Sequence, residues 1–327
     1  MPKMGQICGE TERIVRSELS ASVSGKTLID YLSHRFTYHT SEEWLHAISC
    51  GEILLDGNIT APGTVLMPGM VLEYHPVFLK EPDCDLRYEV LYEDERVLAV
   101  AKSGNLASHP AGPFFKHTLW YQLRLHYGDV NPINRLDRET SGVMLFARDR
   151  TTAALLGKQL AFMQKCYYAL VFGTFTQAID ANGYLEPDSG SVVRKKRRFC
   201  FGPVPETHCG NVQSCRTLLE PVATVNGISL VRALPRSGRL HQIRATLFSL
   251  GFPLLGDKLY GPDDRIYLKL RAENITEEDR QKLVLPRQAL HAASLRLRLP
   301  WEDDERIFFA PLPQDMQLPG FPCVFEG

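Results

Sequence analysis

The stretch NPINRLDRETSGVMLFARD, residues 131–149, decides both the expected fold and the expected site of this chain. Its first half gathers Arg135, Asp137, Arg138 and Glu139 in one turn, and its second half is an apolar run typical of a buried strand. Positive charge beside a carboxylate favours its ionised form, which can serve as a nucleophile or a base. A salt bridge on an ordinary surface loop is the alternative interpretation of the same residues.

Composition describes an ordinary globular chain. Its 327 residues are 44% hydrophobic and 23% charged, and the net charge is −1. A nearly neutral molecule binds polyanions only through local basic patches. The run RKKRR at 194–198, which contains Arg194, Lys195 and Lys196, is such a patch, although a solvated loop explains it equally well.

The location and the metal content follow from what the sequence lacks. No apolar run is long enough to span a bilayer, and the N-terminal residues show no apolar signal core. We therefore expect a cytoplasmic protein with reduced cysteines and no membrane partner. The eight cysteines have no C-x-x-C spacing, and Cys209 and Cys215 beside His208 lack the paired knuckles of a zinc site, so we expect no metal.

Four segments follow along the chain. Residues 1–23 form a polar N-terminal segment, and residues 24–76 predict a small α/β domain. Apolar positions recur at helical spacing from Leu28, and Ser41 followed by two acidic residues indicates a second helix start. Asp56-Gly57 is a turn signal between short strands. Residues 77–86 then form a linker to a larger domain, 87–327.

The larger domain predicts an α+β fold. Strand patterns are EVLYEDERVLAVAK, VMLFAR, CYYALVFGTF, ISLVRAL and ASLRLRL, and helical patterns are RTTAALLGKQLAF and LHQIRATLFSLG. Their irregular alternation favours a mixed, largely antiparallel sheet with flanking helices over a doubly wound parallel sheet.

Three further segments carry candidate site residues. In QKCYYALVFG, Tyr167 and Tyr168 point to opposite faces of a strand, so one of them can face a pocket. In RSGRLHQIR, His241 and Arg244 share a helical face, and Arg239 precedes that helix. A helix start surrounded by basic side chains suits a phosphate. The third segment, GDKLYG, adds Lys258 in a loop. Each segment alone is also compatible with ordinary packing or a solvated basic face.

The combination is more specific than its parts. RLDRETSG, KxYxA, GRLHQIR, GDKLYG and LHA occur in this order, and the set resembles the RluA-type pseudouridine synthases over about residues 88–313. Residues 24–76 resemble the alpha-L RNA-binding domain that precedes the catalytic domain in many members. Two departures stand out: Asn134 replaces the usual His before RLD, and HQIRAT replaces HQIRVH. The second helix of the small domain begins with the acidic SEEW, which weakens any inferred RNA contact there.

The resemblance implies an isomerase that converts uridine in structured RNA to pseudouridine without a cofactor. It implies that Asp137 attacks the flipped nucleotide, that Tyr167 stacks near the base and assists proton removal, and that Arg244 pairs with Asp137. Leu290 would line the uracil pocket. We expect a monomer that acts on ribosomal RNA, with transfer RNA as the alternative. The residues expected to contact RNA are Asn134, Arg135, Arg138, Arg194, Lys195, Lys196, Arg239, His241 and Lys258.

Two other functions remain open at this stage. A catalytically silent RNA-binding paralogue would keep the fold, but it would be free to lose Asp137, Tyr167 or Arg244. A carboxylate glycosidase would need a second carboxylate at a defined separation, and no such partner is evident. The presence of all three residues favours the isomerase.

Overall fold

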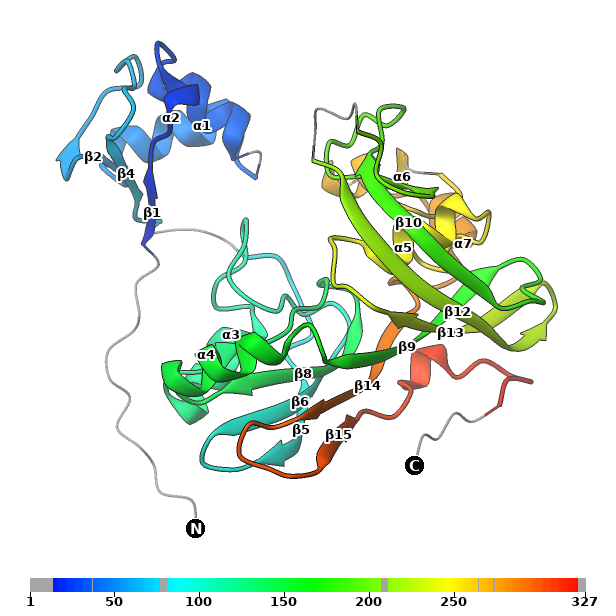
Figure 1. The fold of residues 1–327 in the computed structure, drawn as a ribbon. Coiled ribbons are helices and arrows are strands. Elements are labelled where there is room, and N and C mark those ends of the chain that lie inside the picture. The colour runs from blue at the N-terminus through cyan, green and yellow to red at the C-terminus, as the bar shows by residue number, and fades with distance from the viewer. Residues whose placement is uncertain are drawn as a thin grey trace. The chain divides into compact units, whose positions relative to one another are not determined.

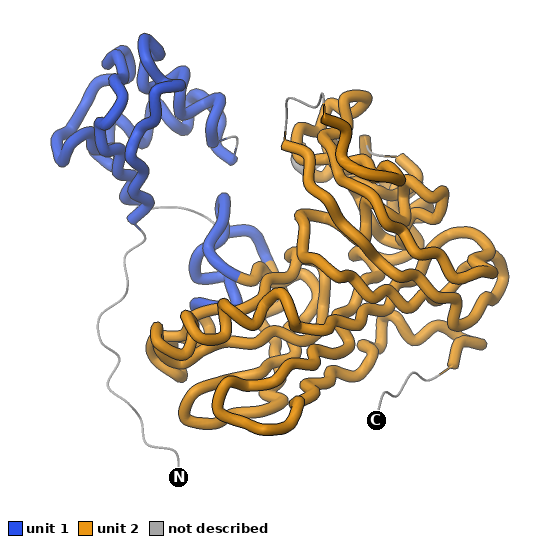
Figure 2. Tube along the Cα trace, viewed as in Figure 1, with its two compact units in different colours: residues 1–83, 109–121 blue, residues 84–108, 122–327 orange. Residues whose placement is uncertain are grey.

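The computed structural model describes residues 14–36, 38–76, 81–206, 211–263, 265–272 and 274–322 (Figure 1). Parts of three predictions lie outside these ranges: residues 1–13 of the polar segment, 77–80 of the linker, and the pair His208 and Cys209. The chain divides into two compact units, one of residues 1–83 with 109–121 and one of residues 84–108 with 122–327 (Figure 2).

The first unit packs helices on a small antiparallel sheet. The sheet order is β1-β4-β2-β3. The strands are β1 (Val15–Glu18), β2 (Ile53–Leu55), β3 (Asn58–Ile59) and β4 (Val71–Tyr74), and the helices are η1 (Ala21–Val23), α1 (Leu28–Arg35) and α2 (Ser41–Ser49). Trp44 of α2 is fully buried in the core, and its indole nitrogen donates to the carbonyl of Phe36. The β2–β3 turn has positive φ at Asp56 and Gly57, as the turn signal predicts.

Helix α2 begins at Ser41, as the sequence predicts, but the residue that caps it is Thr40. The hydroxyl of Thr40 accepts from the backbone N–H of Glu43. The carboxylate of Glu43 accepts in turn from the backbone N–H of Thr40 at 2.6 Å. This reciprocal pair is a capping box, so at least one acid of SEEW stabilises the helix end.

The second unit is built on one large sheet with the strand order β11-β10-β12-β13-β9-β14-β8-β6-β5, with β7 on β8 and β15 on β14. Every pairing is antiparallel except β8 with β14. The mixed, largely antiparallel fold is confirmed. The strands are β5 (Tyr88–Glu93), β6 (Val97–Lys102), β7 (Asn131–Pro132), β8 (Ser141–Ala147), β9 (Gln164–Phe172), β10 (Ile179–Pro187), β11 (Arg197–Phe201), β12 (Gln213–Val225), β13 (Ile228–Pro235), β14 (Leu290–Arg298) and β15 (Glu305–Phe309).

The helices that follow α2 along the chain are short. They are α3 (Leu119–Tyr127), α4 (Arg150–Gln159), α5 (Gln242–Ser249), α6 (Arg265–Arg271), α7 (Glu277–Leu283) and η2 (Gln314–Met316). The helical spacing of the sequence predicts α4 and α5. No helix in the described ranges is long and apolar enough to cross a bilayer.

The parallel contact of β8 with β14 brings the two ends of the predicted site together. His291 and Ala292 pair with Ser141 and Gly142. A Cβ on Gly142 would lie 2.1 Å from the carbonyl oxygen of Ala292, so only glycine allows this approach. Because β9 also pairs with β14, with Tyr167 opposite Ala292, the segment after Asp137 and the strand of Tyr167 converge on β14.

Candidate active site

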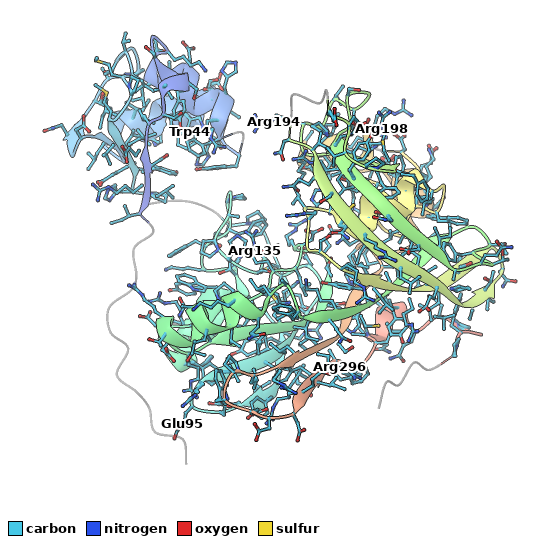
Figure 3. The ribbon with its side chains drawn as sticks, in the orientation of Figure 1. Trp44, Glu95, Arg135, Arg194, Arg198 and Arg296 are labelled. Carbon is cyan, nitrogen blue, oxygen red and sulfur yellow. The ribbon has the colours of Figure 1, made fainter. Side chains whose placement is uncertain are left out.

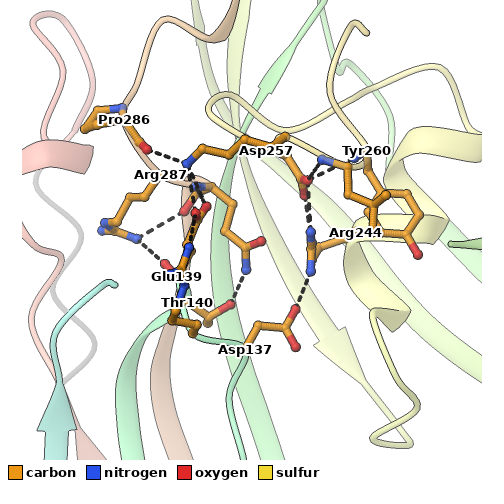
Figure 4. A network of polar contacts seen from close by, with 12 residues as sticks. Asp137, Glu139, Thr140, Arg244, Asp257, Tyr260, Pro286 and Arg287 are labelled. Atoms are coloured by element: carbon orange, nitrogen blue, oxygen red, sulfur yellow. Dashed lines mark hydrogen bonds and ion pairs between the residues drawn. The ribbon is translucent and has the colours of Figure 1, made fainter. Parts of the chain in front are cut away.

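Asp137 is joined to Arg244, a residue far away in the sequence. Nη1 of Arg244 donates to Oδ2 of Asp137 at 2.6 Å (Figure 4). The side chain of Asp137 keeps 30% of its surface exposed, while that of Arg244 keeps 10%. Asp137 therefore sits at the edge of the buried region, with its charge compensated from the inside.

A second carboxylate completes the pair. Asp257 is fully buried and accepts from Nε and Nη2 of Arg244 at 2.7 and 2.9 Å. Its Oδ1 also accepts the backbone N–H groups of Leu259 and Tyr260, each at 2.9 Å. These donors hold the carboxylate of Asp257 in place, and Asp257 in turn holds the guanidinium of Arg244. An N–H on Nη1 of Arg244 is thereby directed at Asp137. The sequence interpretation missed Asp257, although it is the acid of GDKLYG.

The charges of this trio shift the pKa of each member. Burial raises the pKa of Asp137, but the charge and hydrogen bond of Arg244 outweigh it and lower the pKa below its usual value. Asp257 has a lowered pKa for the same reasons. The two carboxylates raise the pKa of Arg244 despite its burial. Asp137 is therefore ionised at neutral pH without any metal ion.

Two tyrosines border the trio. Burial, and then the charge of Asp137, raise the pKa of Tyr167, which is 9% exposed. Its hydroxyl makes no hydrogen bond to any residue in the described ranges. The ring of Tyr260 stacks against the guanidinium of Arg244, and the distance from Cζ of Arg244 to the ring centroid is 5.0 Å. The hydroxyl of Tyr260 lies 3.0 Å from Nδ1 of His241.

The position of His241 corrects the expected helical face. His241 has φ 57° and is the N-cap of α5, so it precedes the helix that carries Arg244. It still lies at the site through its contact with Tyr260. Burial and then Arg244 lower its pKa to about 4, so the ring is neutral at pH 7. A neutral imidazole can position a group but contributes no positive charge toward a phosphate.

Lys258 does not have the solvent-facing role that the sequence suggested. It is buried, and its ammonium donates to both oxygens of Glu139 at 2.9 Å and to the carbonyl of Pro286. Arg287 donates to the carbonyl of Glu139 at 3.0 Å. Lys258 therefore fastens the segment after Asp137 to the segment before β14, and it is not free to neutralise a phosphate.

The other side of the Asp137 turn is held by a buried lysine. Lys102, 2% exposed, donates to the carbonyls of Ser103, Leu106 and Arg138 at 2.7, 2.8 and 3.0 Å. Three acceptors satisfy the three N–H groups of an ammonium. The sequence interpretation missed Lys102, because a single lysine at the end of an apolar strand has no distinctive pattern.

Asn134 also has a structural role in place of the expected RNA contact. It is 9% exposed, its Nδ2 donates to the carbonyl of Val143 at 3.2 Å, and its Oδ1 accepts from the N–H of Leu145 at 2.8 Å. The amide therefore connects the Asp137 turn to β8. Leu290, expected near the base, is 4% exposed at the start of β14 and pairs with Ala169 of β9.

The remaining predicted cations divide into exposed and engaged groups. Arg135 and Arg194 are exposed (Figure 3). Lys195 and Arg239 are also exposed, and Arg138 is partly exposed with Glu139 3.4 Å away. Lys196 is 4% exposed, lies 4.5 Å from the ring centroid of Phe248, and has Asp188 at 3.9 Å. The run 194–198 is therefore no uniform phosphate patch, because Arg198 is also paired, with Glu186.

Comparison with known proteins identifies the chain. A family model described as RNA pseudouridylate synthase matches residues 96–249. The dual-specificity RNA pseudouridine synthase RluA of Vibrio cholerae is 32% identical over 197 residues, which cover 59% of this chain and 74% of that protein. The chain belongs to the RluA-type RNA pseudouridine synthases. This synthase is an isomerase that converts uridine to pseudouridine in RNA.

Two further comparisons bear on the extent of the similarity. The ribosomal large subunit pseudouridine synthase D of Pseudomonas aeruginosa is 28% identical over 313 residues, 91% of this chain and 92% of that protein. The solved structure titled human RNA pseudouridylate synthase domain containing 1 has a TM-score of 0.50 and 23% identity, and the match covers 71% of this chain and 86% of that one. That structure supports the fold of the synthase.

Proposed function

We propose that Asp137 is the nucleophile of this synthase and that Arg244 holds it ionised and aimed at the substrate. The observation that carries the proposal is the 2.6 Å contact from Arg244 to a carboxylate that is still 30% exposed. A fully buried ion pair would be a structural element, whereas in this pair the Asp137 side chain remains partly exposed and its charge acts on the buried Tyr167.

The reaction needs no group beyond these residues. The target nucleotide leaves its stack, which costs a few kcal/mol, and the apolar surroundings of Tyr167 and Leu290 offset that cost. Asp137 adds to the anomeric carbon or to the uracil ring, the bond from C1′ to N1 breaks, and the uracil turns. A bond from C1′ to C5 then forms and the carboxylate is released, while C5 loses its proton and N1 takes one up. Atoms balance because pseudouridine is an isomer of uridine.

The role of Tyr167 is narrower than the resemblance implied. Its raised pKa keeps the phenol protonated at neutral pH, so a phenolate base is absent from the resting site. The ring supplies an aromatic face for the base, and the hydroxyl, which has no partner among the described residues, serves as a donor. Removal of the C5 proton then passes to Asp137 or to water.

Ribosomal RNA is the proposed substrate class, and transfer RNA the second candidate. The similarity to the large-subunit enzyme of Pseudomonas aeruginosa spans both units of this chain, whereas the Vibrio cholerae relative is named for dual specificity. Exposed Arg135, Arg194, Lys195 and Arg239 are the proposed phosphate contacts. We propose residues 24–76 as an RNA-binding domain, with the protein acting as a cytoplasmic monomer.

The test is Asp137→Asn, which preserves shape and removes the charge. We expect pseudouridine formation to fall below detection, a loss of at least about 10³-fold by analogy with other nucleophile deletions, while RNA affinity changes by less than about threefold. The assay is tritium release from transcripts labelled at uracil C5, with transcripts of large-subunit ribosomal RNA and of transfer RNA compared. Glu139→Gln is not a suitable control because it unpairs Lys258, so Asp304→Asn, on an exposed residue with no ion pair to the described residues, is used. Full activity of Asp137→Asn would refute the assignment.

A further inference from the structure

Lys165 is a half-buried cation for which the mechanism above has no use. It lies on β9 two residues before Tyr167, so both side chains emerge on the same face of the strand, about 7 Å apart along it. Its ammonium has no hydrogen bond or ion pair with any residue that the structure describes. Burial alone lowers its pKa, and no carboxylate offsets that effect. An ammonium withdrawn from water without a partner is costly unless a ligand supplies the missing anion.

The ammonium faces a loop that carries further donors. A Cβ placed on Gly238 would lie 3.7 Å from Nζ of Lys165, so the lysine reaches the residue 238 backbone. The loop of residues 236–239, here called the Gly238 loop, includes the exposed side chains of Arg236 and Arg239. Gly238 has no positive φ, and an added Cβ would meet no backbone atom within 4 Å. The fold itself therefore does not require glycine here, whereas close approach of a ligand to the backbone would favour it.

The Gly238 loop is held rigidly relative to the site. Gln242, 4% exposed, accepts at Oε1 from the hydroxyl of Ser237 at 2.7 Å and from the N–H of Arg239 at 3.1 Å. Its Nε2 donates to the carbonyl of Arg216 and the hydroxyl of Thr217. Gln242 is the first residue of α5, two positions before Arg244, so one short helix sets both the loop and the partner of Asp137.

We propose that Lys165 and the Gly238 loop bind a backbone phosphate of the RNA next to the nucleotide that reacts at Asp137. The choice of phosphate over a reacting group rests on position. Lys165 shares a strand face with Tyr167 but lies about 7 Å from it along β9 and makes no hydrogen bond or ion pair with Asp137 or Arg244, which places it beside the reacting centre and not within it. The inference that the anion is a phosphate depends on the proposal that the substrate is RNA. It does not depend on Asp137 being the nucleophile.

The experiment measures RNA binding and catalysis separately on the full-length protein. Binding of a large-subunit ribosomal RNA transcript is followed against KCl concentration in the Asp137→Asn variant, with and without Lys165→Ala. Loss of one phosphate contact lowers the slope of log affinity against log salt by about 0.9 for a duplex and about 0.7 for a single strand. In the enzyme with Asp137 intact, Lys165→Ala should raise KM about tenfold with kcat changed less than about twofold, and Lys165→Arg should restore most of the affinity.

Controls separate this subsite from general charge effects. Lys158→Ala removes an exposed lysine on α4 and should change neither the slope nor KM. Gly238→Ala should weaken binding in the same direction, and its effect should shrink in the Lys165→Ala background, since both act on one contact. An unchanged salt slope in folded Lys165→Ala overturns the proposal. So does a collapse of kcat at unchanged KM, which would make Lys165 a participant in the chemistry. Because binding is measured without Asp137, a failure of the nucleophile assignment leaves this result readable.

Discussion

At the scale of single residues, the site is organised around one buried cation with two anions. Arg244 gives two donors to the buried Asp257 and one to the partly exposed Asp137. Removing one member of a buried ion pair leaves an uncompensated charge and costs about 3–5 kcal/mol. The trio therefore makes the ionised state of Asp137 a property of folding itself and not of substrate binding.

The pH dependence of catalysis should report this arrangement. Without Arg244, the charge that chiefly offsets burial is lost and the pKa of Asp137 rises, so activity should be lost at a higher pH on the acid side. We predict that the acid limb of kcat/KM moves upward by about 1–3 pH units in Arg244→Gln. The measurement is tritium release between pH 5 and 8.

The variant is built in an Asp257→Asn background, because Asp257 would otherwise be left as a buried, unpaired charge. Arg298→Gln is the control, since Arg298 is exposed at the end of β14 and has no proposed part in the site. An acid limb at the wild-type pH in the double variant would show that Arg244 does not set the ionisation of Asp137.

At the scale of elements, the side-chain amide of Asn134 joins the Asp137 turn to β8 by making the hydrogen bonds that a backbone peptide group would make. The N–H of Ile133 donates to the carbonyl of Leu145 at 2.8 Å, extending the β7–β8 ladder. The next rung uses the amide of Asn134, which bonds the N–H of Leu145 and the carbonyl of Val143. The ladder thus continues while the main chain turns away toward Asp137.

Asn134→Ala should therefore destabilise the protein. It leaves an N–H and a carbonyl unpaired on Leu145 and Val143, both fully buried, at a cost of about 2–4 kcal/mol in the free energy of unfolding. Urea denaturation followed by tryptophan fluorescence measures the change. Asn131→Ala on β7 is the control, because its side chain makes no hydrogen bond to the described residues. Equal midpoints for the two variants would count against the ladder interpretation.

At the scale of the whole second unit, His291 connects three parts of the fold. Its Nδ1 lies 2.9 Å from the hydroxyl of Ser141 on β8, and its Nε2 lies 3.0 Å from the carbonyl of Ala310 after β15. The ring is neutral in this arrangement, with Nε2 donating and Nδ1 accepting. Burial, and to a smaller extent Arg287, lower its pKa to about 4.

This shift makes stability depend on pH. A histidine with a folded pKa near 4 and an unfolded pKa near 6.5 binds fewer protons in the folded state, so stability falls as the pH drops from about 6.5 to about 4. We predict a loss of about 3 kcal/mol from His291 over that window. His291→Gln should be less stable than the wild type at pH 7, and this gap should close or reverse near pH 4.

Urea denaturation at a series of pH values gives the comparison. His126→Gln, on an exposed residue of α3, should follow the wild-type curve. If the free energy of unfolding changed with pH in the same way for His291→Gln and the wild type, His291 would not be held neutral by the fold.

The amino-acid sequence alone determined the features that depend on neighbours along the chain. The apolar run 143–147 predicts a buried strand, helical spacing predicts α4 and α5, and Asp56-Gly57 predicts its turn, because strand and helix periods are local properties. The motif order also predicted the family, since RLD, KxYxA and HQIR each keep their own local form. The strands at 179–187, 197–201, 213–225 and 305–309 were missed, because turn-forming and charged residues lie among their apolar positions, such as Asn182-Gly183 in the first and Pro221 in the third.

Only the tertiary structure decided which charges are free and which are paired. Asp137 and Arg244 are 107 residues apart, Lys258 and Glu139 are 119 apart, and no local pattern encodes either contact. Lys258, Lys196 and Asn134 therefore looked like RNA contacts in the sequence but proved to be engaged within the fold. Lys165, the lysine of KxYxA, was given no role from the sequence, yet it is a half-buried cation without a partner in the described structure. The physical reason is that Coulomb energy and desolvation depend on distance in space and on burial, which arise only when the strands have assembled.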